Sequence, residues 1–195
     1  MYADLSPKAA EIVSHARHLL ENGGYNGFSY ADISAQVKIS KASIHHHFPT
    51  KAELVREVVM RYRAEAREGL SLLEKQLANP AAELTAYTDY WSTCISGGTS
   101  SFCIGAMLAA ELPSIPAEVA VEVRGHFEDL TAWLSATLER GAAAGQFTLD
   151  ASPEIEAKVF MAAVHGAMLA ARGLGDPSAF ESLVHVSVRR ILRAP

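Results

Sequence analysis

The histidine triplet His45, His46 and His47 is the first group of residues whose type suggests chemistry. Imidazole is a common metal ligand, and in its protonated form it also attracts phosphate. On a helix, successive side chains point about 100° apart, so three neighbours do not converge on one ion. The triplet therefore favours anion contact and packing over metal binding. His15 and His18 could share a helical face, but no third ligand is near them in sequence, so we expect an exposed or half-buried pair.

Cys103 is the second chemically distinctive residue. Together with Cys94 it makes two cysteines, too few for a disulfide framework. A nearby cation would lower the pKa of the Cys103 thiol and make it reactive, and Arg172 is a candidate for that cation. The alternative is a small buried hydrophobic residue.

Motifs typical of enzymes are missing from the sequence. It contains no nucleotide-binding loop, G-x-S-x-G, H-E-x-x-H or paired-cysteine metal motif. The long helical segments carry no Glu-x-x-His sets of the kind that build carboxylate–metal bundles. We therefore expect no enzyme and no cofactor, although a helical enzyme and an interaction bundle that binds no DNA remain as alternatives.

The elements that position these residues are helices. The chain has 195 residues, 49% of them hydrophobic and 20% charged, and it lacks the alternating pattern of strands. Caps, prolines and glycines predict nine helices, which cover approximately residues 7–22, 30–37, 41–47, 51–78, 80–97, 102–110, 117–144, 153–173 and 177–193. The fold class predicted is all-α, with two domains.

Residues 28–54 predict a helix-turn-helix. Two short helices are joined by residues 38–40, with Ile33 and Val37 spaced four apart on the first and Ile44 and Phe48 four apart around the second. Helices this short are unstable alone, and such apolar pairs hold them crossed on a third helix. The second helix of such a motif can enter the major groove of DNA.

The distribution of charge supports this interpretation. The net charge is −5, which argues against nucleic acid, but residues 1–56 carry six basic and five acidic side chains. The remaining residues carry eleven basic and seventeen acidic ones. The acidity therefore lies outside the predicted motif, whose mildly basic surface suits phosphate contact.

Residues 7–56 resemble the DNA-binding region of TetR-family transcriptional regulators, on the strength of Gly24-Tyr25, FSYADI and KISKASIHHHFPTKAEL. The resemblance implies a DNA-binding domain over residues 1–50 and an effector-binding and dimerisation domain over residues 51–195. It also implies a homodimer that binds a near-palindromic operator, usually as a repressor, and leaves it when an unidentified small molecule binds. Activation of transcription remains an alternative.

The resemblance also assigns roles to residues. Ser29 caps a helix and lies where the family often contacts phosphate, Lys51 matches a phosphate-contacting lysine, and the second helix of the motif contacts base edges and backbone. The predicted DNA-binding residues are Ser29, Lys38, Lys41, Ala42, Ser43, His45, His46 and Lys51. The chain departs from the family at Lys38, often glycine, and at His45, usually tyrosine.

The second predicted domain supplies the candidate effector pocket. Its residues are aromatic, sulfur-containing or basic side chains of the long helical segments, and ordinary core packing is the alternative for each: Tyr87, Tyr90, Trp91, Phe102, Cys103, Met107, His126, Trp133, Met161, His165 and Arg172. The segment around Cys103 is also similar to that of TetR-type repressors that respond to electrophiles and oxidants, which implies release by modification of Cys103.

Small and apolar residues near the C-terminus predict the dimer interface. The members are Ala163, Gly166, Ala167, Ala170, Leu183, Val184, Val188 and Ile191, with packing inside one chain as the alternative. The first residues carry charges throughout, so they do not form a signal-peptide core. The longest uncharged run, residues 90–110, is interrupted by polar and flexible residues. We therefore expect a cytoplasmic protein without a membrane partner.

Overall fold

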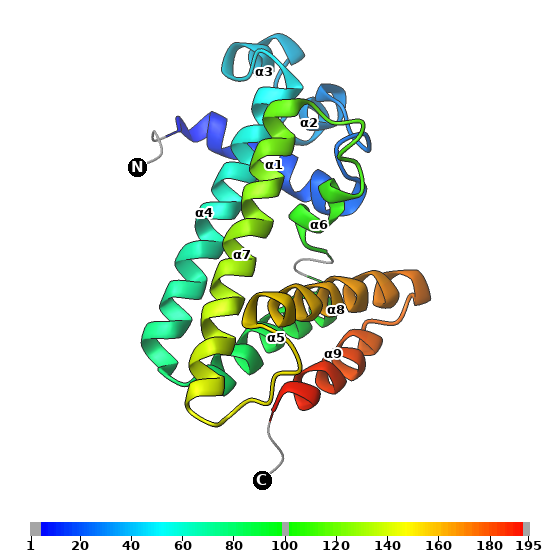
Figure 1. The fold of residues 1–195 in the computed structure, drawn as a ribbon. Coiled ribbons are helices and arrows are strands. Elements are labelled where there is room, and N and C mark those ends of the chain that lie inside the picture. The colour runs from blue at the N-terminus through cyan, green and yellow to red at the C-terminus, as the bar shows by residue number, and fades with distance from the viewer. Residues whose placement is uncertain (1–4, 99–101, 193–195) are drawn as a thin grey trace. The chain divides into compact units, whose positions relative to one another are not determined.

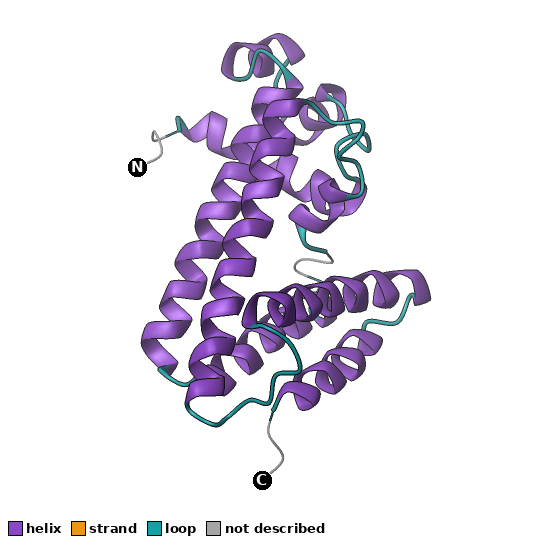
Figure 2. Cartoon of the chain, viewed as in Figure 1, coloured by secondary structure: helices purple, strands orange, loops and turns teal. Residues whose placement is uncertain are grey.

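The computed structural model describes residues 5–98 and 102–192, which form helices joined by loops (Figures 1 and 2). Within those residues the helices are α1 (Pro7–Gly23), α2 (Tyr30–Val37), α3 (Lys41–His47), α4 (Lys51–Leu77), α5 (Pro80–Ser96), α6 (Ile104–Ala109), α7 (Ala117–Ala143), α8 (Pro153–Leu174) and α9 (Ser178–Ile191). Strand pairing in the same residues is limited to an isolated antiparallel bridge between Phe147 and Leu192. The predicted all-α class with nine helices is confirmed.

Helix starts follow local side-chain caps. Ser6, Ser29, Ser40, Asn79 and Ser152 each accept a hydrogen bond from an amide in the first turn of the helix that follows. These bonds satisfy amides that have no partner inside the helix. The starts were predictable from sequence because the cap and its amide lie within three residues of each other.

Several helix boundaries lie one or two residues from their approximate predicted positions. The helix expected from Phe102 begins at Ile104, and the one expected to reach Ala78 ends at Leu77. The helix α8 continues one residue beyond the predicted end, because Gly175 takes the left-handed cap conformation, with φ 63°. The predicted end of the last helix, Arg193, lies outside the described residues.

The chain forms two compact units. Unit 1 contains the residues up to Ala64 together with Cys103–His126, and unit 2 contains Glu65–Phe102 together with the residues from Phe127 onward. The helix α6 and the first part of α7 therefore belong to the same unit as the helix-turn-helix. The predicted domain boundary at residue 50 does not coincide with this division.

The core of unit 1 is built on α1 and α4. The helix α1 buries its apolar stripe, and α2 and α3 each contribute the apolar residues predicted from their spacing. The helix α6 packs on α1 (Figure 1). The fully buried apolar residues include Ile12, Ala16, Leu20, Ile33, Ile44, Leu54, Val59, Ile104, Leu108 and Val119. Ile39, in the turn between α2 and α3, is only half-buried.

The core of unit 2 includes a buried carboxylate that is paired with a partly exposed arginine. The Glu83 carboxylate is 1% exposed and lies 2.5 Å from Arg140 Nη2, and Thr137 donates a hydrogen bond to it at 3.4 Å. The second guanidinium nitrogen of Arg140 lies 3.1 Å from the Glu74 carboxylate. This network joins α4, α5 and α7 inside the unit. None of the described helices is both long enough and apolar enough to cross a bilayer.

Candidate DNA-binding surface and effector region

The turn between α2 and α3 takes a conformation that lysine rarely adopts. Lys38 has φ 56° and ψ 43°, the left-handed region that favours glycine. The Ser34 hydroxyl donates a hydrogen bond to the Ile39 carbonyl at 2.6 Å and helps to fix the turn. The departure from glycine at Lys38 is therefore accommodated, and this exposed lysine stands at the turn itself.

The helix α3 presents a polar face over an apolar underside. Ile44 is fully buried, whereas Lys41, Ala42 and His46 are exposed and Ser43 is half-buried. Ser40 caps the helix through the Ser43 amide, which leaves the positive end of the helix close to the exposed side chains. This arrangement suits insertion of the first turns of α3 into a major groove.

The ring of His45 is held in a defined orientation. Its Nδ1 lies 3.0 Å from the Pro49 carbonyl oxygen, and the ring packs at 4.7 Å from the Tyr30 ring. Because a carbonyl only accepts, Nδ1 is the donor and Nε2 remains for an outside partner. Tyr30 is fixed by a hydrogen bond from its hydroxyl to the Phe48 carbonyl, at 2.8 Å. His45 is exposed, as a residue that contacts the DNA backbone must be.

Ser29, predicted to cap a helix, forms a capping box with Asp32 at the start of α2. Its hydroxyl accepts from the Ala31 amide, and the Asp32 carboxylate accepts from the Ser29 amide at 2.7 Å and from its hydroxyl at 2.8 Å. These hydrogen bonds hold the pKa of Asp32 below its usual range. Ser29 itself remains exposed at the start of α2.

Lys51 differs from the other predicted DNA-binding residues because its amine is engaged inside the unit. Lys51 Nζ donates to the Phe28 carbonyl and lies 4.1 Å from the centre of the Phe28 ring and 4.7 Å from that of Tyr25. Burial lowers the pKa of Lys51, and the Glu111 and Asp32 carboxylates oppose that effect. The position of this lysine therefore depends on the loop between α1 and α2.

Three of the predicted effector residues belong to unit 1, and two of them meet there. Cys103 is 1% exposed, Tyr62 donates a hydrogen bond to its Sγ at 3.2 Å, and His126 Nε2 lies 3.7 Å from Sγ. Met107 is half-buried on α6. Sequence reasoning missed Tyr62, whose only signal was its place on the apolar face of α4.

The surroundings of Cys103 favour the alternative that the sequence left open, a small buried residue, over an activated thiol. Burial raises the pKa of Cys103, although the Tyr62 hydroxyl and the Gly105 and Ala106 amides partly oppose this effect. The proposed cation, Arg172, lies instead over the Phe102 ring in unit 2, 5.6 Å from its centre.

The other predicted effector residues lie in unit 2. Tyr87, Trp91 and Phe102 are buried, the Tyr87 and Trp133 rings are 5.7 Å apart, and the His165 ring lies 5.3 Å from Phe127. Met161 receives a weak hydrogen bond from Thr131, at 3.9 Å. Tyr90 is 56% exposed, which argues against a place for it inside an enclosed pocket.

The indole of Trp133 has an unsatisfied donor. Its Nε1 is buried and has no hydrogen-bond partner among the described residues. Such a donor costs free energy unless something accepts from it. Among the aromatic residues predicted for the pocket, Trp133 is therefore the strongest candidate to donate a hydrogen bond to a ligand.

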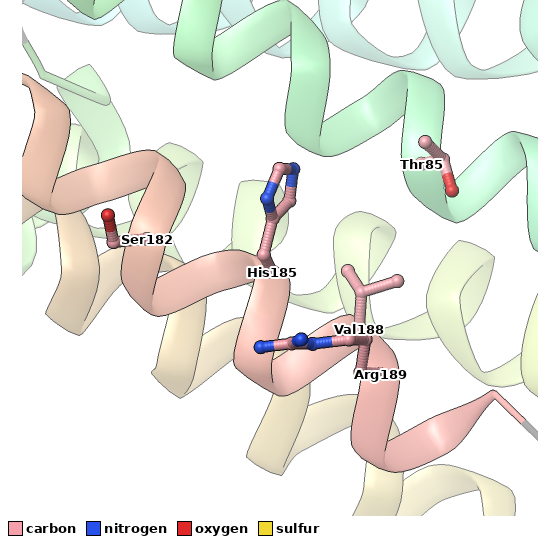
Figure 3. A pocket seen from close by; sticks show the side chains of 5 residues that line it. All are labelled: Thr85, Ser182, His185, Val188 and Arg189. Atoms are coloured by element: carbon pink, nitrogen blue, oxygen red, sulfur yellow. The ribbon is translucent and has the colours of Figure 1, made fainter.

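A separate groove of about 530 Å³ lies on unit 2 between α5 and α9 (Figure 3). His185 and Val188 point from α9 toward α5, which carries Thr85, and Ser182 and Arg189 complete the lining (Figure 3). None of the predicted effector residues lines this groove.

The residues predicted for the dimer interface fall into two groups, one buried inside the chain and one at least partly exposed. Ala167, Val184, Val188 and Ile191 are buried inside the chain, where α9 packs on α8 and on α5, which is the alternative that the sequence left open. Gly166 and Leu183 are exposed, and Ala163 and Ala170 are half-buried. The exposed face of α8 also carries apolar residues that the prediction omitted, namely Ile155, Val159 and Leu169.

The described residues hold no group of three or more histidine, cysteine or acidic side chains placed to bind a metal. They do form a capped recognition helix whose exposed side chains are polar or basic apart from Ala42, and a second helical unit that buries several aromatic side chains. This combination defines a helix-turn-helix transcriptional regulator.

Comparison with known proteins identifies the family. Residues 12–58 match the family described as bacterial regulatory proteins, tetR family, and residues 80–186 match the tetracyclin repressor-like C-terminal domain. The chain belongs to the TetR family, and it is a DNA-binding transcriptional regulator rather than an enzyme.

Individual relatives agree with this assignment. A TetR-family transcriptional regulator from Agrobacterium tumefaciens is 48% identical, with a TM-score of 0.94 over 95% of this chain and 98% of that one. A TetR regulator from Legionella pneumophila is 27% identical, with a TM-score of 0.85 over 97% of this chain and 100% of that one. The HTH-type transcriptional repressor DhaR of Mycobacterium sp. (strain GP1) is 24% identical over 161 residues, 78% of this chain and 80% of its own length.

Proposed function

We propose that the protein represses transcription by binding a near-palindromic operator as a homodimer, and that a small molecule releases it. The observation that carries the proposal is the exposed face of α3, with Lys41, Ala42 and His46 raised above the buried Ile44. Two such helices, one from each subunit, would enter major grooves about 34–36 Å apart. The repressor role is supported by relatives such as DhaR, which carry that name.

The test of DNA binding begins with selection of duplexes from a random-sequence pool. Recovery of an inverted repeat, bound at least about a thousandfold more tightly than random duplex, supports the proposal. Placing that repeat between a promoter and a reporter then distinguishes repression from activation. A selection that recovers no common sequence refutes the proposal.

The proposed dimer interface is the exposed apolar face of α8 with part of α9. Ile155, Val159, Gly166 and Leu169 follow one another at spacings of three, four or seven residues, and Leu183 adds an exposed apolar side chain from α9. Apart from its chain neighbours and the adjoining backbone of α8, a Cβ added to Gly166 would meet no atom within 4 Å. A glycine inside a helix costs about 1 kcal/mol of stability relative to alanine. Close approach of a second helix would explain why glycine occupies position 166. Light scattering that gives a monomeric mass at micromolar concentration would refute the interface.

The proposed effector contacts are Tyr87 and Trp91, which are buried, and Trp133, which is half-buried and has a buried indole nitrogen. Tyr87, Trp91 and Trp133 supply apolar surface and one unsatisfied indole N–H donor. These features favour a ligand with an apolar body and a hydrogen-bond acceptor. In titrations with candidate ligands, a Trp133→Phe variant should bind about tenfold more weakly with the fold intact.

Modification of Cys103 is the alternative trigger. The thiol lies between Tyr62 and His126, so an adduct on Sγ cannot fit unless these neighbours or α6 move. Treatment of native protein with N-ethylmaleimide, followed by mass analysis and a gel shift, tests this alternative. It fails if Cys103 stays unmodified and the protein stays on its DNA.

A further inference from the structure

The Glu111 carboxylate, just after α6, is bound to the loop between α1 and α2. Its Oε2 accepts from the Tyr25 amide at 2.6 Å, and its Oε1 accepts from the Asn26 amide at 3.2 Å and from the Asn26 side chain at 3.0 Å. Hydrogen bonds to an ionised acceptor are among the stronger ones in proteins. Both carboxylate oxygens are therefore committed to a loop more than 80 residues away in sequence.

Gly24 makes room for this carboxylate. It has φ 70°, and a Cβ built on it would lie 2.3 Å from Glu111 Oε2. A side chain at this position would therefore be strained and would also displace the carboxylate. The glycine that ends α1 and the acid that follows α6 thus form one arrangement.

The same loop holds Lys51. Tyr25 and Phe28 provide the two rings beneath the amine, and the Phe28 carbonyl accepts its hydrogen bond. Glu111 also acts on Lys51 through its charge and opposes the effect of burial on the pKa of the lysine. Glu111 therefore affects Lys51 in two ways, through the loop backbone and through its charge.

The opposite end of α6 is packed as tightly. The helix follows directly on Cys103, and a Cβ added to Gly105 would lie 2.5 Å from the His126 ring. The helix has six residues, of which Ile104 and Leu108 are fully buried. These contacts hold α6 within unit 1, and Glu111 follows the end of this helix by two residues.

We propose that Glu111 is the positioning residue for Lys51, and that it acts through its hydrogen bonds to the α1–α2 loop. This inference rests on the proposed function, because Lys51 is taken to contact phosphate. It adds a DNA-binding determinant that lies outside the helix-turn-helix.

A double-mutant cycle on the selected duplex tests the link. We expect Glu111→Gln, which replaces one accepting oxygen by an amide donor, to weaken binding about tenfold. Lys51→Ala should weaken it as well, and the double variant should bind no more weakly than Lys51→Ala alone, since Glu111 acts through the lysine. Glu128→Gln, which removes the same charge from an exposed site on α7, is the matched control and should have no effect in either background.

Additive losses from Glu111→Gln and Lys51→Ala would overturn the proposal, as would unchanged binding by a folded Glu111→Gln variant. If that variant does not fold, Gly24→Ala displaces the same carboxylate from the opposite side and takes its place in the cycle with the same expectation. If no duplex is selected, the proposed function fails, and the link is judged by NMR titration of the Lys51 amine. Its midpoint should move to lower pH in Glu111→Gln but not in Glu128→Gln, and an unmoved midpoint overturns the link.

Discussion

Replacement of Arg140 by alanine should leave the Glu83 carboxylate buried without its main counter-charge. Glu83 is 1% exposed, and its remaining bond would be that from Thr137, at 3.4 Å. Removing one partner of a fully buried pair costs about 3–5 kcal/mol of unfolding free energy. Because the Arg140 side chain is 37% exposed, water can replace part of what it supplies. We therefore expect a loss of about 2–3 kcal/mol.

The assay is urea unfolding followed by far-UV circular dichroism. All variants are compared at one protein concentration, because association contributes to apparent stability. Lys158→Ala is the control, since it breaks an exposed pair with Glu154 on α8, and it should cost no more than about 0.5 kcal/mol. Adding Glu83→Gln to Arg140→Ala should recover part of the loss, because a neutral amide is cheaper to bury than a carboxylate. The reasoning fails if Arg140→Ala costs no more than the control.

Four further predictions concern the DNA contacts, the dimer interface, the Cys103 thiol and the release from DNA. Lys41→Ala should relax specificity at one base pair, with a loss of about 1–3 kcal/mol there, whereas Lys51→Ala should weaken all duplexes and reduce the salt slope by about one; equal effects of both variants on selected and random DNA would contradict the base-reading role. Val159→Glu should produce monomers in light scattering, since it buries a charge in the proposed interface; a retained dimer would move the interface elsewhere. Cys103 should react with N-ethylmaleimide more slowly than Cys94 near neutral pH and faster as pH rises, because its raised pKa keeps the thiol protonated; mass analysis after timed quenching measures both rates. An effector that releases the protein should bind more weakly when operator is present, by the same factor by which it weakens DNA binding; equal effector affinity with and without operator, measured by calorimetry, would exclude this form of release.

The local part of the structure could be predicted because its causes are local. Ser29 and Asp32 lie three residues apart, so the capping box that starts α2 was visible in the sequence. The burial of Ile33 and Ile44 followed from spacing in the same way. The helix-turn-helix and its exposed residues are short-range features of this kind.

The contacts that were not predicted join residues far apart in the chain. Nothing near Glu111 indicates that it binds the Tyr25 amide, and nothing near Cys103 indicates that Tyr62 and His126 surround it. The division of α8 into inner and outer faces was also missed. Small and apolar residues occur around much of that helix, so periodicity did not separate those that pack on α9 from those left exposed.

Unit 1 is assembled from two stretches of sequence, and this affects how the DNA-binding unit could be transferred to another protein. A chimera that joined residues 12–58 to the body of another regulator would carry the recognition helix but lose Ile104, Leu108 and Val119 from its core. It would also lose the Glu111 carboxylate that receives the Tyr25 amide. A chimera designed to exchange operator specificity should therefore also contain residues 103–126, so that the transferred unit 1 keeps its core. The part of this regulator that must be transferred together is therefore discontinuous in sequence.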